Sequence, residues 1–325
     1  MRTYEQELID ARRFIEEHDD FLVVAHVQPD GDAVSSTLAV GWLLSRLGKT
    51  FTLINEGPIP QRMMYMNGAD RILNMSVTER TRTYGNVICV DCADFKRVGL
   101  VSDWMEDGAN MLNIDHHPTN DEYGTQTLIK ADAAATAEIL YDLLASFELE
   151  WDRDLAEMLY TGILTDTGGF RYSSTSPKVM RIASHLLELG VNGPDLADSL
   201  LEQLTKPQFD VLTQALATLK MSNDGKVAWV HVTPEHMMQT GASNEDLEGI
   251  VNYPRNIQGV EVGVLFKVIN GDAVKASMRS AGKVDVAAIA AEFGGGGHVR
   301  AAGCRLEGSL AEVTQRVIAR IGQSL

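Results

Sequence analysis

One short stretch of the chain combines three side chains that could bind a metal ion. The sequence HVQPDGD, residues 26–32, carries the imidazole of His26 and the carboxylates of Asp30 and Asp32. Carboxylates this close repel each other unless a cation balances their charge, and Asp and His side chains are common ligands of divalent ions. The same aspartates could instead cap a helix that begins near residue 33. This stretch alone leaves a metal site and a helix cap both open.

Two further segments, VICVD (87–91) and MLNID (111–115), are predicted strands that also end on acidic or imidazole side chains. The carboxyl ends of parallel strands lie along one edge of a sheet, so residues far apart in sequence can meet there. Caps could explain any one of these side chains, but caps do not require histidines at strand ends. The set comprises Asp91, then Asp115, His116 and His117, and finally Asp166 at the end of a helical segment, in a Gly- and Thr-rich turn.

The residue types in this set suit a pair of divalent ions. Two ions about 3.5–4 Å apart need several carboxylates and a few imidazoles. The aspartates at 30, 32, 91 and 166 would balance two divalent cations, and the loaded site could then accept an anionic phosphate. Mixed His and Asp ligands without cysteine favour Mn²⁺, Mg²⁺ or Co²⁺ over a structural zinc ion. The sequence therefore predicts a two-metal site.

The elements that must position these residues alternate between short apolar runs and helical patterns. This alternation predicts an α/β fold with a parallel sheet covered by helices on both faces. In the first half the expected strands are 21–27, 51–56, 87–91 and 111–115, and the expected helices are 33–47, 134–147, 152–164 and 177–189.

A second region follows an interruption by Gly and Pro near 189–195. We expect a catalytic domain over 1–189, a helical linker over 190–206 and a smaller α/β domain over 207–325. Asn270-Gly271-Asp272 predicts a hairpin between two of its strands. The expected helices are 195–203, 207–221, 284–293 and 310–321, and the expected strands are 226–232, 260–269 and 273–280.

Composition narrows the class of partner. The formal net charge is −17, which argues against binding long nucleic acid because that requires a basic surface. A small phosphorylated substrate stays compatible, because bound cations supply positive charge locally. No run of 18 apolar residues occurs, and the charged N-terminus lacks the apolar core of a signal peptide. We expect no membrane contact and a cytoplasmic location.

The three cysteines do not suggest a metal site or a disulfide framework. Cys89-x-x-Cys92 could be redox active, but Cys89 lies inside the apolar run VICVD, and Cys304 stands alone. Buried free thiols in a reducing cytoplasm are the favoured interpretation.

The stretch FGGGGHVRAAG (293–303) indicates a second functional segment. Four glycines exceed what a helix end needs, and they let the backbone approach an anion closely. The stretch fits neither a Walker loop nor a dinucleotide fingerprint. Arg279 in the preceding strand and His298 after the glycines are suited to phosphate. Arg300 is a weaker candidate, because an ordinary surface arginine is the commoner explanation.

Taken together, the candidate metal-site residues between His26 and Asp166 resemble the four motifs of the DHH phosphoesterase superfamily in order and approximate spacing. The triplet Asp-His-His is present at 115–117, and the resemblance extends over most of the chain. It implies that His117 faces the substrate phosphate and that Asp115 orients an imidazole. It also implies two ions bridged by Asp91, with the further ligands His26 and Asp30 on one ion and Asp32, His116 and Asp166 on the other.

The GGGH run followed by AAG resembles the DHHA1 domain, which implies a nucleotide clamp. Arg97 occurs where related sequences often carry Arg-x-Gly, and it could also reach the substrate. The implied clamp residues are Arg279, His298, Gly295, Gly296 and Gly297.

At this length, with a DHH segment followed by DHHA1, the chain looks most like the nanoRNase/pAp phosphatase group. This implies hydrolysis of very short oligoribonucleotides to mononucleotides, and of 3′-phosphoadenosine 5′-phosphate (pAp) to AMP. Monomer and homodimer both stay open.

Other activities remain as alternatives. The chain could act mainly on dinucleotide second messengers such as pApA, pGpG or c-di-AMP. A family II pyrophosphatase would share the metal motifs but is expected to carry Ser-Arg-Lys-Lys rather than GGGGH. A RecJ-like exonuclease would need additional domains, and a non-catalytic nucleotide sensor is disfavoured because every ligand position is filled.

Overall fold

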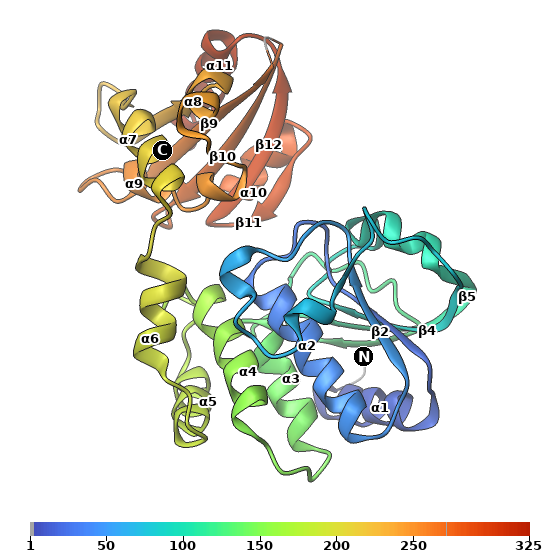
Figure 1. Cartoon of the computed structure of the whole chain (residues 1–325). Helices are drawn as coiled ribbons and strands as arrows, with labels where there is room; N and C mark the ends of the chain where they lie inside the picture. Colours follow the sequence, from blue (N-terminus) through green and yellow to red (C-terminus); the bar gives the residue numbers. More distant parts are fainter. Residues whose placement is uncertain (1–2, 271) are drawn as a thin grey trace. The chain divides into compact units, whose positions relative to one another are not determined.

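The computed structural model describes residues 3–270 and 272–325, and it divides into two compact units, Met1–Gln203 and Leu204–Leu325 (Figure 1). Each unit contains its own six-stranded sheet. The two units are described separately below.

The first unit is built on an all-parallel sheet with the strand order β3-β2-β1-β4-β5-β6. The chain runs outward from β1 in one direction and then outward from β4 in the other, so the order reverses between these two strands. Such a switch point leaves a crevice at the carboxyl ends of the strands. The strands are β1 Phe21–Val24, β2 Phe51–Asn55, β3 Leu73–Asn74, β4 Tyr84–Val90, β5 Met105–Asp115 and β6 Gln126–Ile129.

Both faces of this sheet are covered, as predicted. Alternate residues of β1 point to opposite faces: Phe21 and Val23 join the core formed with the helices, and Leu22 and Val24 pack under η3 (Phe95–Trp104). The remaining elements are α1 Tyr4–Glu17, α2 Gly31–Arg46, η1 Gln61–Met63, η2 Ala69–Arg71, α3 Thr136–Ala145, α4 Arg153–Asp166, α5 Pro177–Glu188, α6 Gly193–Ala197 and η4 Asp198–Glu202.

The second unit is a mixed sheet with the order β11-β12-β10-β9-β8-β7, in which only β8 and β9 pair in parallel. Helices α10 and α11 supply the core on one face, and α7 packs on β8 over the other. The elements are α7 Lys206–Ala217, β7 Lys220–Met221, β8 Val227–Val232, α8 Pro234–Thr240, η5 Glu245–Leu247, α9 Asn252–Arg255, β9 Val262–Asn270, β10 Ala273–Ser280, α10 Val286–Glu292, β11 Gly296–His298, β12 Ala301–Glu307 and α11 Leu310–Gly322.

Two predicted elements need correction. The strand predicted over 21–27 ends at Val24, because the next N–H, that of Ala25, donates to the side chain of Asn55 at 2.8 Å. The helix predicted over 207–221 ends at Ala217. There the Thr218 hydroxyl accepts from the N–H of His231 at 2.8 Å, and the chain then turns into β7.

The domain boundaries and the linker over 190–206 stay predictions. Helix α6 and the π-helical turn η4 occupy most of that segment. Gly271, at the centre of the predicted hairpin, lies outside the described residues. The flanking strands β9 and β10 pair antiparallel.

The cysteines are buried and free, as predicted. Burial raises the pKa of the Cys89 thiol, and it raises the pKa of the Cys92 thiol to about 12. Both groups are therefore poor nucleophiles at neutral pH. Among the described residues, no helix has both the length and the apolar character that a membrane span requires.

Candidate metal centre

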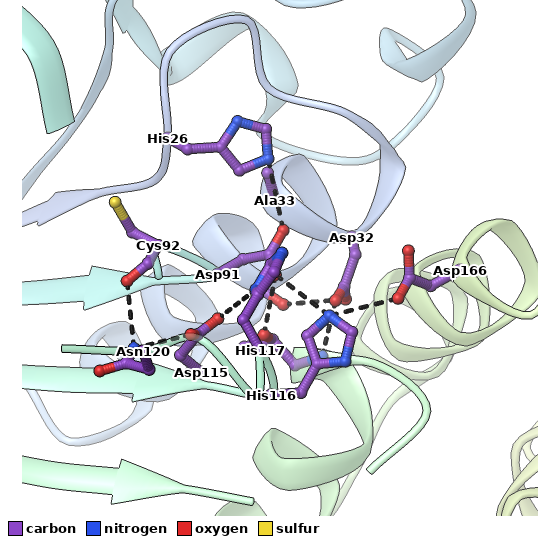
Figure 2. Close-up of polar contacts among 12 residues, drawn as sticks. His26, Asp32, Ala33, Asp91, Cys92, Asp115, His116, His117, Asn120 and Asp166 are labelled. Carbon is purple, nitrogen blue, oxygen red and sulfur yellow. Dashed lines mark hydrogen bonds and ion pairs between the residues drawn. The ribbon is translucent and has the colours of Figure 1, made fainter. Parts of the chain in front are cut away.

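The acidic and imidazole residues predicted to bind metal converge where the first sheet reverses its strand order. His26 follows β1, Asp91 follows β4, and Asp115 ends β5. These three strands are neighbours in the sheet. Figure 2 shows their side chains directed toward one another, together with those of His116, His117 and Asp166. The switch point therefore positions the cluster, because it brings the ends of β1, β4 and β5 side by side.

A first group of potential ligands consists of His26, Asp30 and Asp91. The Nε2 atom of His26 lies 3.5 Å from Oδ2 of Asp91 and 3.9 Å from Oδ2 of Asp30. The other oxygen of Asp30 caps α2, because it accepts from the N–H groups of Asp32 and Ala33 at 3.1 and 3.2 Å. Asp30 is thus both a helix cap and a potential ligand.

A second group consists of Asp32, His116 and Asp166. The Nε2 atom of His116 lies 3.3 Å from Oδ2 of Asp166 and 3.6 Å from Oδ1 of Asp91. The two oxygens of Asp91 therefore face different groups, with Oδ2 toward His26 and Oδ1 toward His116. This geometry suits one carboxylate bridging two ions.

Asp91 is held in this position by an unusual backbone conformation and a hydrogen bond. Its φ is +54°, a value that few residues other than glycine adopt and that asparagine and aspartate tolerate best. The hydroxyl of Thr136 donates to its Oδ1 at 3.0 Å. Strained conformations of this kind persist at functional sites when the surrounding structure fixes them.

Both candidate imidazole ligands are oriented through their second nitrogen. The Nδ1 atom of His26 lies 2.9 Å from the carbonyl oxygen of Val27, and that of His116 lies 3.3 Å from the carbonyl oxygen of Ala133. In each ring this pairing directs Nε2 toward the carboxylates. Backbone carbonyls often orient metal-binding histidines in the same way.

Asp32 is fixed by the N-terminus of α3. Its Oδ2 accepts from the N–H of Thr136 at 2.6 Å, and its Oδ1 accepts from the N–H of Ala137 at 3.0 Å. The positive end of a helix favours the charged form of a carboxylate. Thr136 therefore contacts two of the predicted ligands, although its sequence position gave no signal of this role.

Gly162 in α4 is a second residue that the sequence did not single out. A Cβ at this position would lie 2.6 Å from Oδ1 of Asp32, 2.5 Å from Oγ of Ser35 and 2.7 Å from the Cβ of Ala137. The absence of a side chain leaves the room that Asp32 occupies. A similar need for space applies to Gly31, where a Cβ would lie 2.5 Å from Oγ1 of Thr165.

Gly162→Ala is expected to displace Asp32 and to lower the Mn²⁺ affinity roughly 10–100-fold. The crowding should also cost about 1–3 kcal/mol of unfolding free energy. The matched control is Gly322→Ala in α11, where a new Cβ meets no heavy atom within 4 Å. Isothermal titration with Mn²⁺ and chemical denaturation measure both effects. Equal behaviour of the two variants would contradict the role given to Gly162.

The remaining histidine, His117, pairs with Asp115 and also forms a third group of potential ligands with Asp91 and His116. Its Nδ1 lies 2.7 Å from Oδ1 of Asp115, which is fully buried. The other oxygen of Asp115 accepts from the side-chain amide of Asn120 at 2.7 Å (Figure 2). His117 Nδ1 also lies 3.7 Å from Oδ1 of Asp91, so the ring borders both groups of potential ligands. A carboxylate in this position fixes the orientation of an imidazole.

The electrostatics of the cluster favour the binding of a cation. Burial opposes the charge of Asp91, but the hydrogen bond from His26 and the nearby His116 and His117 outweigh it and lower the pKa of Asp91. Burial and the charges of neighbouring aspartates raise the pKa of both Asp32 and Asp166 well above the usual value. Divalent ions would stabilise the charged form of all three carboxylates. The donor set therefore fits two hard or borderline cations.

Arg97 lies beside the first group. Its carbonyl oxygen accepts from the N–H of Val27 at 2.7 Å. Its predicted contact with substrate stays a prediction.

The predicted clamp residues lie in the second unit, on and beside β10, β11 and β12. A depression of about 500 Å³, hereafter the trough, brings together Arg279, Gly295 and Gly296. Gly297 and His298 belong to the edge strand β11. Arg300 packs against Gly282, where a Cβ would lie 2.9 Å from its guanidinium, and it does not line the trough. The trough is lined by Lys275, Ser277, Arg279, Gly295, Gly296, Ala301, Ala302, Gly303, Cys304 and Arg305.

Comparison with known families gives two matches. The DHH family, N-terminal domain, matches residues 20–163, and the DHHA1 domain matches residues 214–324. The first match contains the ligand candidates from His26 to His117 but ends before Asp166. The second contains the whole trough.

Similar proteins match over nearly the whole chain. The bifunctional oligoribonuclease and PAP phosphatase NrnA of Thermus thermophilus is 32% identical, and the alignment covers 93% of this chain and 89% of that protein. NrnA of Bacillus subtilis is 25% identical, with 90% of this chain and 91% of that protein covered. The crystal structure of an exopolyphosphatase-related protein from Bacteroides fragilis superposes with a TM-score of 0.89 at 26% identity, covering 97% of this chain and 95% of that one.

Proposed function

This chain belongs to the DHH phosphoesterase family, and from that premise we propose that it hydrolyses very short oligoribonucleotides to mononucleotides and pAp to AMP. The observation that carries the proposal is the position of Asp91 between two groups of ligands, His26 with Asp30 and His116 with Asp166. The similarity to NrnA proteins supports the choice of substrates.

Two divalent ions bound there would supply an activated water and neutralise the charge that develops on the phosphoryl oxygens. The chain itself supplies the orientation of the ligands. His117, held by Asp115, is proposed to contact the phosphoryl group under attack. We propose Mn²⁺ as the ion, because imidazoles accompany the carboxylates and no cysteine takes part.

The second unit is proposed to hold the remainder of the nucleotide. Arg279 offers a guanidinium to a phosphate, and His298 follows the glycines of β11. A clamp of this limited size explains how an acidic protein accepts a nucleotide without binding long nucleic acid. The proposed location is the cytoplasm, which keeps its three buried thiols reduced.

A panel of substrates with Mn²⁺ tests this function. Turnover of pAp and of dinucleotides such as pApA and pGpG is expected, with far less turnover of c-di-AMP and pyrophosphate. Chelation of the metal should abolish turnover of every substrate. Efficient hydrolysis of c-di-AMP with no action on pAp would assign the chain to second-messenger turnover, and rapid hydrolysis of pyrophosphate would also overturn the proposal.

A further inference from the structure

The trough in the second unit lies on a sheet face that the helices cover only in part. Residues of β10 alternate between the two faces: Ala276 and Met278 are buried in the core with α10 and α11, whereas Lys275, Ser277 and Arg279 point the other way. On that same face, α7 covers β8 and β9. Strands β10 and β12 are left to form the floor of the trough.

Small residues form the floor of the trough, and cationic side chains lie at both of its ends. The register pairs Ser277 with Gly303 and Lys275 with Arg305, and paired residues point to the same face. Arg279 lies at one end, and Lys275 with Arg305 at the other. Arg279 lies four positions after Lys275 along β10, which corresponds to about 13 Å. That span exceeds a single nucleotide and is within reach of two.

Several cationic side chains lie close together at the Lys275 end, an arrangement that lowers the stability of the sheet. Lys267 of β9 is also paired with Lys275, so three cations lie in a row across three strands, and directly opposed like charges destabilise a sheet. Burial and the charge of Lys275 lower the pKa of Lys267.

Among the residues that the structure describes, the recorded partners of this row are one neutral amide and one distant carboxylate. Lys267 donates to the side chain of Asn244, which is uncharged. Glu307 approaches Arg305 only to 3.9 Å, and both side chains are mostly exposed, so this pair contributes little. In a chain with a net charge of −17, a concentration of positive charge that faces an open depression is suited to an anion.

We infer that Lys275 and Arg305 form a second phosphate subsite, separate from Arg279, that holds the 3′-proximal phosphate of an oligonucleotide. This inference rests on the proposed function and deepens it. When pAp binds at the Arg279 end, the second subsite stays empty. When a longer substrate binds there, the phosphate of the following nucleotide fills the second subsite. The subsite therefore sets a preference among short substrates, and it is not needed for pAp.

The test compares a 5′-phosphorylated RNA tetranucleotide with pAp as substrates of the Lys275→Ala/Arg305→Ala double variant. The KM for the tetranucleotide is expected to rise about tenfold or more, because each charge-assisted hydrogen bond contributes about as much as a factor of ten in affinity. Its kcat and the KM for pAp should stay within about twofold of the wild type. The salt dependence of tetranucleotide binding should also become shallower, by roughly 0.7 in slope for each phosphate that the variant no longer neutralises.

Lys220→Ala is the matched control, because Lys220 is an exposed lysine on β7 at the opposite edge of the same sheet. Lys275→Glu is a second variant with the same expected direction. An unchanged KM for the tetranucleotide, or an equal rise for both substrates, would overturn the inference. Fluorescence anisotropy of a labelled tetranucleotide measures binding without turnover. If the wild type cleaves neither substrate, the proposed function fails, and the binding measurement still decides whether the subsite exists.

Discussion

Asp91→Asn is expected to lower kcat for pAp and short RNA at least about a thousandfold. The two carboxylate oxygens of Asp91 face different groups of ligands, so the substitution weakens both ion sites at once. Loss of metal stabilisation in the transition state amounts to several kcal/mol, and each 1.36 kcal/mol is a factor of about ten in rate. Steady-state kinetics with saturating Mn²⁺ measure the effect.

Asparagine is the right replacement because it keeps the shape of the side chain and tolerates the positive φ of residue 91. The hydrogen bond from Thr136 can also persist through its amide oxygen. Asp107→Asn is the control, since Asp107 is exposed near the start of β5, at the other end of the strand from Asp115. Activity within tenfold of the wild type, in a variant that unfolds at the wild-type temperature, would refute the role of Asp91.

His117→Ala is expected to lower kcat about 10²–10³-fold and to leave Mn²⁺ binding nearly unchanged. The ring is oriented by Asp115 through Nδ1, so its Nε2 is the nitrogen proposed to reach the phosphoryl group. Removing it takes away an interaction made most strongly in the transition state, which lowers kcat more than it raises KM.

Two measurements separate this role from metal binding. Titration with Mn²⁺ should give the same stoichiometry for His117→Ala as for the wild type, whereas Asp91→Asn should lose affinity. Asp115→Asn should lower kcat in the same direction, because it disturbs the orientation of the ring. Loss of one Mn²⁺ per chain in His117→Ala would instead assign His117 as a ligand, consistent with its distance of 3.7 Å from Asp91.

The sequence indicated which acidic and imidazole residues lie together, but it did not indicate the residues that support them. Asp91 and His116 could be identified because carboxylates and imidazoles at strand ends have a chemical signature, and parallel strands bring those ends together. Thr136 and Gly162 have no such signature. Their roles depend on which helix packs beside Asp32, and only the folded structure determines that packing.

Competing hydrogen bonds explain where the predicted elements end differently. Local periodicity extended the first strand to residue 27, but the Asn55 side chain takes the Ala25 N–H that a neighbouring strand would otherwise use. The short strand β11 was not predicted because glycines carry no strand signal, yet it pairs with β12 in the folded sheet. Asp30 shows that two competing interpretations of one residue can both hold, since one oxygen caps α2 and the other faces His26.

The central claim is that this chain is a metal-dependent hydrolase of very short RNA. Its most direct test is the Mn²⁺-dependent rate of hydrolysis of 5′-labelled RNA from two to twenty-four nucleotides, measured at equal substrate concentration. The rate is expected to be highest for substrates of two to about five nucleotides and to fall steeply with length, because the trough is short and the chain carries a net charge of −17. A rate that stays constant up to twenty-four nucleotides would contradict the account.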